Sequence, residues 1–555
     1  MMSVRFQQAI RHRPWLSCWV GGGTLAVATA AGTEAYSDIQ ENRYLAEQSD
    51  QCSLPMEYNR QQIREYWIRR PVSVITRLGK ITYELSPCLA SYMHYSLYLS
   101  NPGLHAFQEN NDNYEVRLEE SKRLQAVQLR EALTNLGPAF IKAGQQLAIR
   151  PDLVPPVVLK ELQQLCDSVR PIPDDVALEV LKKELGLMER MHTSCSKGKN
   201  NNFASRKLDD VFENLHLVAA ASLGQVYKAK LKDSGRDVAI KIQRPGMRKA
   251  FSLDLFLLQG WGDFMDVFTT IFTKQKPFHR TLFDSFSRGS YSELDYENEA
   301  KNQSHFQYEL GKRNCPVKIP DVYYDYSTQL VLTTEWIDGV KLADSPSSTI
   351  RRLIPVGVEL FLTQLLDIGA FHSDPHPGNL LVTKDGKLCL LDFGLCAEVD
   401  QREREAMTRA IVHLLYRDFD MLIHSDTKEL GFLPHDFDTE ELKPILTKVL
   451  TGGLLESGSD MKKRKRKLME ISNELNEIFF RYPFQVPGFF ALVTRGLGLL
   501  EGIALVGDPD FDIFMASAPY ATKRAASILG DYGYRRMTKS LTRRNSNRSS
   551  GIAEL

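Results

Sequence analysis

The chain has 555 residues, 43% of them hydrophobic and 25% charged, and its 69 basic side chains balance 69 acidic ones. This composition excludes a disordered chain and leaves room for more than one core. A formal net charge of zero gives no overall attraction to nucleic acid, so we expect no nucleic acid partner. The eight cysteines include no CxxC pair, which argues against a disulfide framework or a zinc site.

The first 35 residues have the composition of a targeting segment. Three arginines (Arg5, Arg11 and Arg13) occur there, and no acidic residue precedes Glu34. An arginine-rich, acid-poor start is typical of an organelle transit peptide, whereas the apolar run 15–31 is also typical of a membrane anchor or a secretory signal. We favour import into an organelle, with an anchor as the alternative.

Helical patterns follow the targeting segment. Residues 36–113 are mixed in composition, and we predict them to be helical without recognisable chemistry. From residue 114 to 188 the apolar spacing indicates three amphipathic helices, and Gly137 and Pro138 separate the first from the second. The second helix carries Lys142 and Gln145 on one face, where solvent exposure would be their simplest role.

An alanine-rich loop opens a predicted smaller lobe at 207–340, and two strands flank it. Compared with the GxGxxGxV loop of kinases, two glycines are replaced by alanine, which adds a Cβ and stiffens the loop. The sequence VAIK ends at Lys241, which would contact the α- and β-phosphates of a nucleotide. The loop residues predicted to bind the nucleotide are Ala219, Ala221, Ser222, Gly224 and Val226.

An acidic segment supplies the expected partner of the lysine. On a continuous helix, Asp295 and Glu299 would share one face, while Glu293 would lie on another. A kinase needs a helix glutamate to pair with its strand lysine, and Glu299 is the candidate for Lys241. Without the other motifs, a solvated acidic helix would explain the same charges.

A buried strand at 329–335 runs into a short polar connector. It occupies the place of a kinase hinge, where the backbone of Glu335 and Ile337 would bind adenine. The larger lobe is predicted at 341–530, and its helix at 354–368 leads directly into the catalytic loop.

Two motifs carry the expected chemistry, FHSDPHPGN at 371–379 and LLDFG at 390–394. Asp374 would accept a hydroxyl proton or orient a water, while Asn379 and Asp392 would hold Mg²⁺ against the nucleotide phosphates. The run 388–391 reads as a buried strand, with a hairpin turn before it. We assign the two histidines of the first motif to loop orientation, because the adjacent prolines forbid a regular helix bearing a zinc pair.

Other segments set limits on this interpretation. Ser373 stands where protein kinases have an arginine, and no Ala-Pro-Glu follows the second motif, so a docking platform for peptide substrates is not evident. Charged residues interrupt the apolar run 484–506, which we predict to be a buried helix and not a membrane span. The basic run 462–467 is most simply a solvated segment, and the tail 531–555 is predicted to be basic and flexible.

Several of these motifs together resemble the UbiB (aarF-domain, ABC1-type) atypical kinase family. The segment LGPAFIKAGQQLAIRPDLVP at 136–155 resembles its KxGQ signature, AAASLG at 219–224 resembles its alanine-rich loop, and Glu293 with Asp295 matches its ExD motif. The resemblance spans residues 114–525 and is closest to the plastid and cyanobacterial branch; Leu217 departs from it where proline is common. It implies an α+β, two-lobed protein-kinase-like fold with a helical N-terminal KxGQ extension.

The resemblance also implies a function. Lys142, Gln145, Glu293 and Asp295 would gate the site, and the cofactors would be ATP or ADP with Mg²⁺. The protein would be an atypical kinase or ATPase at an organelle membrane, mitochondrial by preference and chloroplastic as the alternative. It would support ubiquinone or plastoquinone synthesis, or lipid homeostasis, with an anionic membrane, lipid or quinone intermediates and quinone-biosynthesis proteins as partners.

Two alternatives remain open. A small-molecule phosphotransferase of the aminoglycoside or choline kinase type shares the catalytic loop but leaves the KxGQ and ExD signatures unexplained. A non-catalytic lipid-binding scaffold could hold nucleotide as a structural ligand, although every group required for phosphoryl transfer is present.

Overall fold

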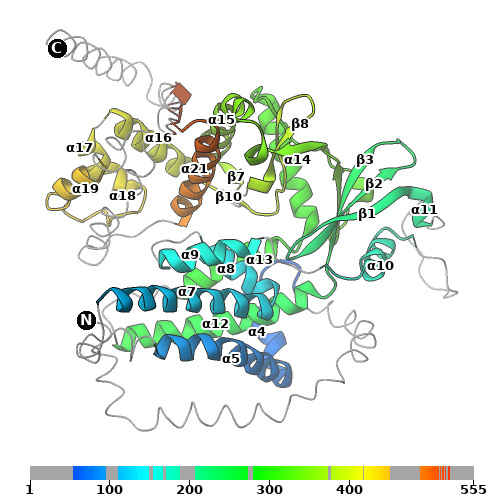
Figure 1. Cartoon of the computed structure of the whole chain (residues 1–555), viewed down its shortest axis with the longest axis horizontal. Coiled ribbons are helices and arrows are strands. Elements are labelled where there is room, and N and C mark those ends of the chain that lie inside the picture. Colours follow the sequence, from blue (N-terminus) through cyan, green and yellow to red (C-terminus); the bar gives the residue numbers. More distant parts are fainter. Residues whose placement is uncertain are drawn as a thin grey trace. The chain divides into compact units, whose positions relative to one another are not determined.

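The computed structural model describes residues 54–94, 111–148, 154–166, 171–187, 207–272, 279–372, 377–416, 418–450 and 488–509, with 511, 513, 516–517, 519–520 and 523–524. The chain divides into two compact units (Figure 1). The helical unit comprises Met1–Arg170, Ala221–Leu223 and Arg244–Leu294, and the mixed unit comprises Pro171–Ala220, Gly224–Gln243 and Asp295–Leu555. Four predicted segments lie outside the described residues: the targeting segment 1–35, the loop aspartate Asp374, the basic run 462–467 and the tail 531–555.

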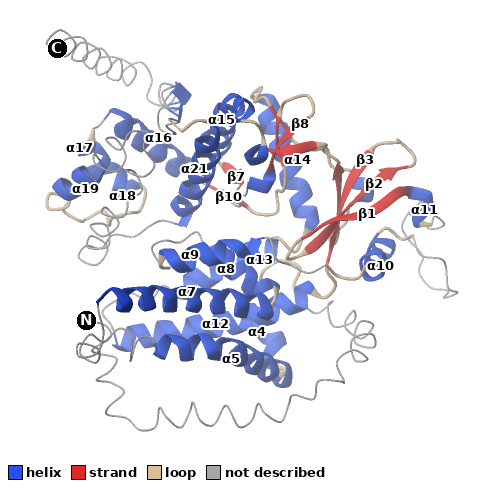
Figure 2. Ribbon diagram, in the orientation of Figure 1, coloured by secondary structure: helices blue, strands red, loops and turns tan. Residues whose placement is uncertain are grey.

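Every regular element described in the helical unit is a helix (Figure 2). Gly137, with φ of 97°, separates the two helices at the predicted place, and Pro138 begins the second, so this boundary is confirmed. The elements are α4 (Arg60–Ile68), α5 (Pro71–His94), α7 (Asn111–Leu136), α8 (Pro138–Leu147), α9 (Pro156–Leu162), a 3₁₀ turn (Gln163–Cys166), α12 (Met247–Phe272) and α13 (His279–Ser292).

Helix α12 packs against the N-terminal helices. Its buried Phe251 and Leu255 belong to one apolar cluster with Ile63 and Trp67 of α4. The indole of Trp67 donates a hydrogen bond to the Ser252 hydroxyl at 3.1 Å. Residues 244–294 group with the helical unit, where Phe251 and Leu255 pack against α4, although the smaller lobe was predicted to span 207–340.

The mixed unit begins with a four-stranded antiparallel sheet in the order β1-β2-β3-β5. One side of this sheet is covered by α10 (Asp174–Glu184), whose Val180 and Leu181 are buried in a cluster with Val238 and Ile240. The strands are β1 (Phe212–Ala220), β2 (Gly224–Leu231), β3 (Asp237–Gln243) and β5 (Val331–Glu335). The short helix α11 (Leu208–Val211) precedes β1, and α14 (Tyr296–Lys312) lies between β3 and β5 in the chain.

The rest of the mixed unit combines small sheets with helices. Strands β4 (Val317–Lys318), β9 (Leu388–Leu390), β8 (Leu380–Thr383) and β6 (Gly339–Lys341) form one sheet, and β7 (Ala370–His372) pairs with β10 (Cys396–Glu398). The predicted hairpin joins β8 to β9 and is confirmed. The helices are α15 (Ser347–Leu362), a π turn (Thr363–Ile368), α16 (Gln401–Tyr416), α17 (Phe419–Met421), a second π turn (Leu422–Asp426), α18 (Thr427–Glu429), α19 (Lys443–Leu450) and α21 (Gly488–Gly507).

A large apolar core lies under the second group of sheets. It includes Phe361 of α15, Leu390 of β9, and Leu500 and Ile503 of α21. Within the described residues, no helix is long and apolar enough to cross a membrane. The α+β fold predicted from the sequence is therefore confirmed, and α21 is a helix packed in this core.

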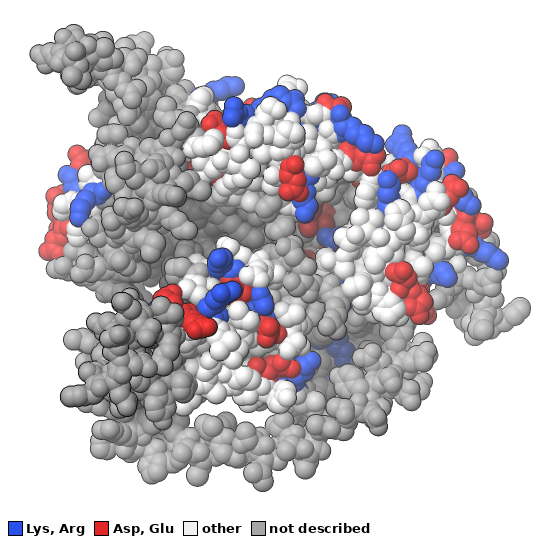
Figure 3. All heavy atoms as spheres, in the orientation of Figure 1, with Lys and Arg blue, Asp and Glu red and all other residues white. Residues whose placement is uncertain are grey.

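Charged side chains are dispersed over the surface. On the face shown in Figure 3, acidic and basic side chains alternate across the described residues without a large area of one sign. This distribution agrees with the zero net charge of the whole chain.

Candidate active site

A lysine and a glutamate meet between the first sheet and α14. Lys241 lies on β3, the third strand in the sheet order, where it pairs with Val226 of β2 and Leu332 of β5. Its Nζ lies 2.8 Å from each carboxylate oxygen of Glu299, which is 4% exposed. The Tyr296 ring centroid lies 5.0 Å from the same ammonium. The structure therefore brings together the two residues that the sequence predicted as partners.

The position of Glu299 depends on how α14 begins. Asp295 is the N-cap of α14, and its side chain accepts a hydrogen bond from the Glu297 amide at 3.0 Å. Glu293 lies in the turn after α13 ends at Ser292. The structure thus differs from the continuous acidic helix we predicted, because capping by Asp295 starts a new helix between the two acids of the ExD motif.

The gating residues occupy separate places. Lys142 Nζ lies 2.7 Å from Glu293 Oε1 within the helical unit, and these two residues are 7% and 9% exposed. Gln145 donates instead to the Leu165 carbonyl at 3.4 Å. Asp295 belongs to the mixed unit. Lys142 is buried, so the solvated helix face considered for it is wrong.

A second carboxylate follows strand β9. Asp392 has φ of 62°, a left-handed conformation that few residues other than glycine adopt, and its carboxylate accepts the Gly394 amide at 3.0 Å. Its Oδ1 lies 3.8 Å from Lys241 Nζ, and its side chain is 44% exposed. Such uncommon backbone conformations cluster at functional sites. Lys241, Glu299 and Asp392 thus form one charged group, called the charged triad below.

The residue after Asp392 fixes this geometry. Phe393 is fully buried, and its ring centroid lies 5.4 Å from that of Phe306 on α14. The Asn302 side chain, also on α14, donates to the Phe393 carbonyl at 3.1 Å. Helix α14 therefore supplies Glu299 and also holds the backbone next to Asp392.

The catalytic loop is described on both sides of residues 373–376. Before it, the buried His372 amide donates to the Gln364 side chain at 2.9 Å. After it, the Leu391 amide donates to the Asn379 carbonyl at 2.8 Å. This bond links the predicted metal ligand Asn379 to the segment that ends in Asp392.

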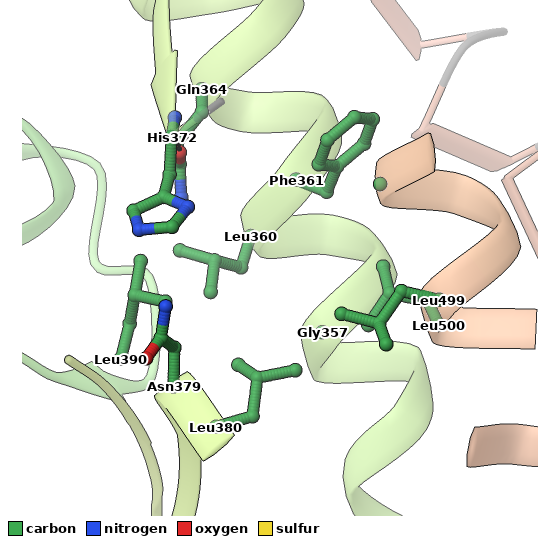
Figure 4. Close-up of a pocket in the computed structure, with 11 residues that line it drawn as sticks. Gly357, Leu360, Phe361, Gln364, His372, Asn379, Leu380, Leu390, Leu499 and Leu500 are labelled. Carbon is green, nitrogen blue, oxygen red and sulfur yellow. Dashed lines mark hydrogen bonds between the residues drawn. The ribbon is translucent and has the colours of Figure 1, made fainter. Parts of the chain in front are cut away.

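A pocket lies on the core side of this loop (Figure 4). His372 and Asn379 extend toward its interior from one side, Leu360 faces them from α15, and Leu380 lies next to Asn379. Its wall is completed by Gly357, Phe361, Gln364, Leu390, Gly496, Leu499 and Leu500. The pocket is mainly apolar, and its polar lining belongs to the loop and to the π turn.

The alanine-rich loop divides between the two units. Ala219 lies on β1 opposite Val226, one residue before the strand ends. Ala221 and Ser222 group with the helical unit, where the Arg244 side chain donates to the Ala221 carbonyl at 3.1 Å. Gly224 begins β2. A Cβ there would lie 2.4 Å from the Ile242 carbonyl oxygen, so this glycine is required by close backbone packing.

The predicted hinge follows β5. The Glu335 amide donates to the Asp321 carbonyl at 2.8 Å, and its carboxylate pairs with Lys318 at 2.7 Å. The Trp336 amide donates to the Asp237 carbonyl at 3.0 Å. Ile337 lies in the connector between β5 and β6 and is half-buried. The strand-to-connector geometry is the one predicted.

The two carboxylates of the charged triad favour the protonated, positively charged form of Lys241. Burial raises the pKa of Glu299 to about 7, although Lys241 opposes this shift; the charge of Asp392 adds to it. Burial works against the charge of Lys241, but Asp392 and Glu299 together raise the pKa of Lys241 well above its ordinary value. The lysine therefore remains a cation throughout the physiological range.

Sequence reasoning missed several supporting residues. Asn302 lies three positions after Glu299 on α14, and this helical spacing could have indicated it. Tyr296 and Gln364 had no such signal, since their roles depend on contacts with distant segments.

These elements define the class of protein. A protein-kinase-like chain has a strand lysine paired with a helix glutamate, and a strand that runs into a hinge connector. It also has a catalytic loop and a carboxylate after the next hairpin, and the elements above correspond to these parts.

The chain belongs to the ABC1 atypical kinase-like family, as the motifs suggested. The model of the ABC1 atypical kinase-like domain matches residues 199–425. An uncharacterized protein of Synechocystis is 35% identical over 84% of this chain and 76% of its own length. The protein Activity of BC1 Complex Kinase 3, chloroplastic, of Arabidopsis thaliana is 38% identical over 74% of this chain and 55% of its own length.

One further relative is named for the aarF domain. A chloroplastic aarF domain-containing protein kinase of Arabidopsis thaliana is 33% identical over 91% of this chain and 66% of its own length. The chain thus spans between about half and three quarters of these relatives. A solved structure of an Rv3197–erythromycin complex from Mycobacterium tuberculosis matches with a TM-score of 0.46 and 22% identity, over 74% of this chain and 97% of that one.

Proposed function

We propose that the chain binds a magnesium nucleotide, ATP or ADP, and transfers or hydrolyses its terminal phosphoryl group. The observation that supports this proposal is the charged triad. In it, the buried carboxylate of Glu299 and the more exposed carboxylate of Asp392 both lie within 4 Å of the Lys241 ammonium, at 2.8 Å and 3.8 Å. Asp392 also has a left-handed backbone conformation, and such conformations cluster at functional sites.

The residues present fit a magnesium ion. Asp392 offers an accessible carboxylate and Asn379 an amide oxygen, and both are hard oxygen donors of the kind that magnesium prefers. Among the described residues, no group of three or more His, Cys, Asp or Glu could hold a metal by itself. Magnesium usually takes one or two protein ligands and completes its shell with phosphate oxygens and water. Bound there, it would neutralise charge on the phosphates.

The remaining roles in binding and catalysis would belong to different residues of the chain. Lys241 would contact the phosphates while Glu299 holds its ammonium in place, and the backbone at Glu335 and Ile337 would bind adenine. Asp374, assigned from the sequence alone, would accept the proton of an attacking hydroxyl or orient a water.

We further propose that the protein acts in a plastid, at a membrane, on lipid or quinone-precursor chemistry. Relatives named as chloroplastic proteins support the chloroplast over the mitochondrion, which was the first preference from the sequence. The lipid or quinone acceptor and the partner proteins rest on the family resemblance.

Nucleotide turnover by the full chain tests the catalytic proposal. We expect magnesium-dependent turnover that Lys241→Met and Asp392→Asn each reduce by on the order of 10²-fold or more. Lys523→Gln, an exposed change elsewhere in the mixed unit, should leave turnover unchanged. Tight nucleotide binding without turnover would instead favour the scaffold.

Vesicles test the membrane proposal. Turnover should rise when vesicles containing anionic lipid are added and rise less with neutral vesicles. Equal turnover with and without either vesicle would contradict the membrane proposal while leaving the nucleotide site intact.

A further inference from the structure

The π turn before the catalytic loop is held from outside by the C-terminal segment. Residues Thr363–Ile368 form this turn between α15 and β7. A π turn is a rare form of helix that frequently occurs at functional sites. It ends at Gly369, whose φ of 79° is left-handed.

Three side chains from later in the chain converge on the turn. The Tyr520 hydroxyl donates to one carboxylate oxygen of Asp367, and Arg524 Nε lies 2.9 Å from the other. Arg524 also donates to the Leu366 carbonyl at 3.3 Å, and Arg404 donates to the Asp367 carbonyl at 3.0 Å. Carbonyl groups that a helix end leaves without partners are therefore satisfied by donors from α16 and the C-terminal segment.

The turn connects directly to the catalytic loop. Gln364 is 2% exposed, and its side chain accepts the amide of His372, two residues before Asp374. In Figure 4, Gln364 and His372 lie beside each other at the end of the pocket that Asn379 also lines. A shift of the π turn would thus move the backbone that enters the loop.

We propose that Tyr520 and Arg524 are positioning residues, which hold the π turn through Asp367 and so set the geometry of the catalytic loop. This inference rests on the proposed function, because it assigns these residues to phosphoryl transfer at the same site. Their contacts are with Leu366 and Asp367 of the π turn, whereas Lys241 and Glu299 of the charged triad lie on β3 and α14.

The contacts of Tyr520 and Arg524 with Asp367, called the brace below, should affect the rate of turnover much more than the affinity for magnesium-ATP. Lys241, Glu299 and the hinge lie on other elements, and Asn379 is the one proposed magnesium ligand in the loop, so magnesium-nucleotide affinity should depend on the brace much less than the rate does. Small displacements of a catalytic group reduce the rate of the chemical step strongly. Tyr520→Phe removes the hydrogen bond and keeps the ring that packs against the core.

The experiment uses the full chain carrying Tyr520→Phe, Arg524→Gln, Arg524→Lys or the adjacent exposed control Lys523→Gln. Turnover, the dissociation constant of magnesium-ATP, and hydrogen exchange of peptides spanning 363–372 are measured on each. We expect Tyr520→Phe and Arg524→Gln to reduce turnover on the order of tenfold, with less than about a twofold change in affinity. Exchange over 363–372 should rise in both, Arg524→Lys should recover part of each effect, and the control should match the wild type.

The outcomes separate this inference from the proposed function. Unchanged exchange and turnover in Tyr520→Phe and Arg524→Gln would overturn the inference, and so would a rate loss matched by an equal loss of affinity. Faster exchange over 363–372 in a chain whose wild type shows no turnover would support the brace and would count against the proposed phosphoryl transfer.

Discussion

The charge of each residue in the triad depends on the other two. Glu299 is buried beside a cation, and Asp392 raises the free energy of a second negative charge nearby. Lys241 stabilises both carboxylates and is stabilised by them. A substitution of one member should therefore affect the charge of the other two, because the three ionisable groups are coupled.

Glu299 gives a pH dependence with a definite sign. Its pKa is raised from 4.5 to about 7, so the folded chain holds a proton that the unfolded chain has released. The stability contributed by this proton is complete below pH 4.5 and is lost as the pH rises through 7. Relative to Glu299→Gln, the wild type should lose on the order of 3 kcal/mol between these limits.

Thermal unfolding across this pH window measures the effect. The difference in midpoint between the wild type and Glu299→Gln should shrink or reverse as the pH rises. Glu297→Gln, an exposed change on the same helix, should give a constant difference. A pH-independent difference for Glu299→Gln would show that this carboxyl titrates normally.

The Lys142–Glu293 pair is the corresponding feature of the helical unit. Both residues are almost fully buried, and removing one partner leaves the other charge in a medium of low polarity. Lys142→Met should therefore destabilise the unit by about 3–5 kcal/mol, as measured by chemical denaturation. Adding Glu293→Gln should restore much of the loss, and a double variant no more stable than Lys142→Met would contradict this account.

At the scale of elements, Gly224 shows why a glycine can match a motif for an unexpected reason. A methyl group on it would meet the Ile242 carbonyl oxygen at 2.4 Å and the Tyr296 hydroxyl at 2.6 Å. The strand pairing of β2 with β3 and the start of α14 would both have to shift. Gly224→Ala should thus disturb Lys241 and Glu299 together.

The matched comparison uses Ala219, an exposed residue of β1 that lies opposite Val226 of β2. Gly224→Ala should cost at least about 2 kcal/mol and weaken nucleotide binding. Ala219→Gly should cost roughly 0.5–1 kcal/mol and change nucleotide affinity only through a looser loop. Equal stability for the two variants in thermal unfolding would contradict the packing argument.

The sequence predicted local elements well and contacts between distant elements poorly. Gly137 with Pro138, and the hairpin before Asp392, carry their own local signals, so their boundaries were confirmed. Asp295 was assigned to a helix interior because charge spacing cannot distinguish a cap from an interior residue. The brace on Asp367 joins residues more than 150 positions apart, and no local pattern predicts such a contact.

At the scale of the whole molecule, the two units are not consecutive in sequence. The strands of the mixed unit are interrupted by α12 and α13, whose Phe251, Leu255 and Tyr291 are buried in the helical unit. A chain starting at residue 171 would lack α4, which buries Phe251 and Leu255. Such a chain should aggregate or elute as large assemblies in size-exclusion chromatography.

A second truncation provides the control. A chain starting at residue 54 keeps every described element, and it should elute as a discrete folded species. A well-folded, soluble protein from residue 171 onward would show that α12 and α13 do not need the N-terminal helices.

Calorimetric titration with ATP, in the presence and absence of magnesium, tests the central claim most directly. The claim is that the charged triad, with Asp392 as a metal ligand, forms a magnesium-nucleotide site. Wild-type protein should bind ATP much more tightly with magnesium than without it, and Asp392→Asn should abolish that difference while keeping the fold. Magnesium-independent ATP binding in the wild type, or an unchanged magnesium effect in Asp392→Asn, would contradict the account.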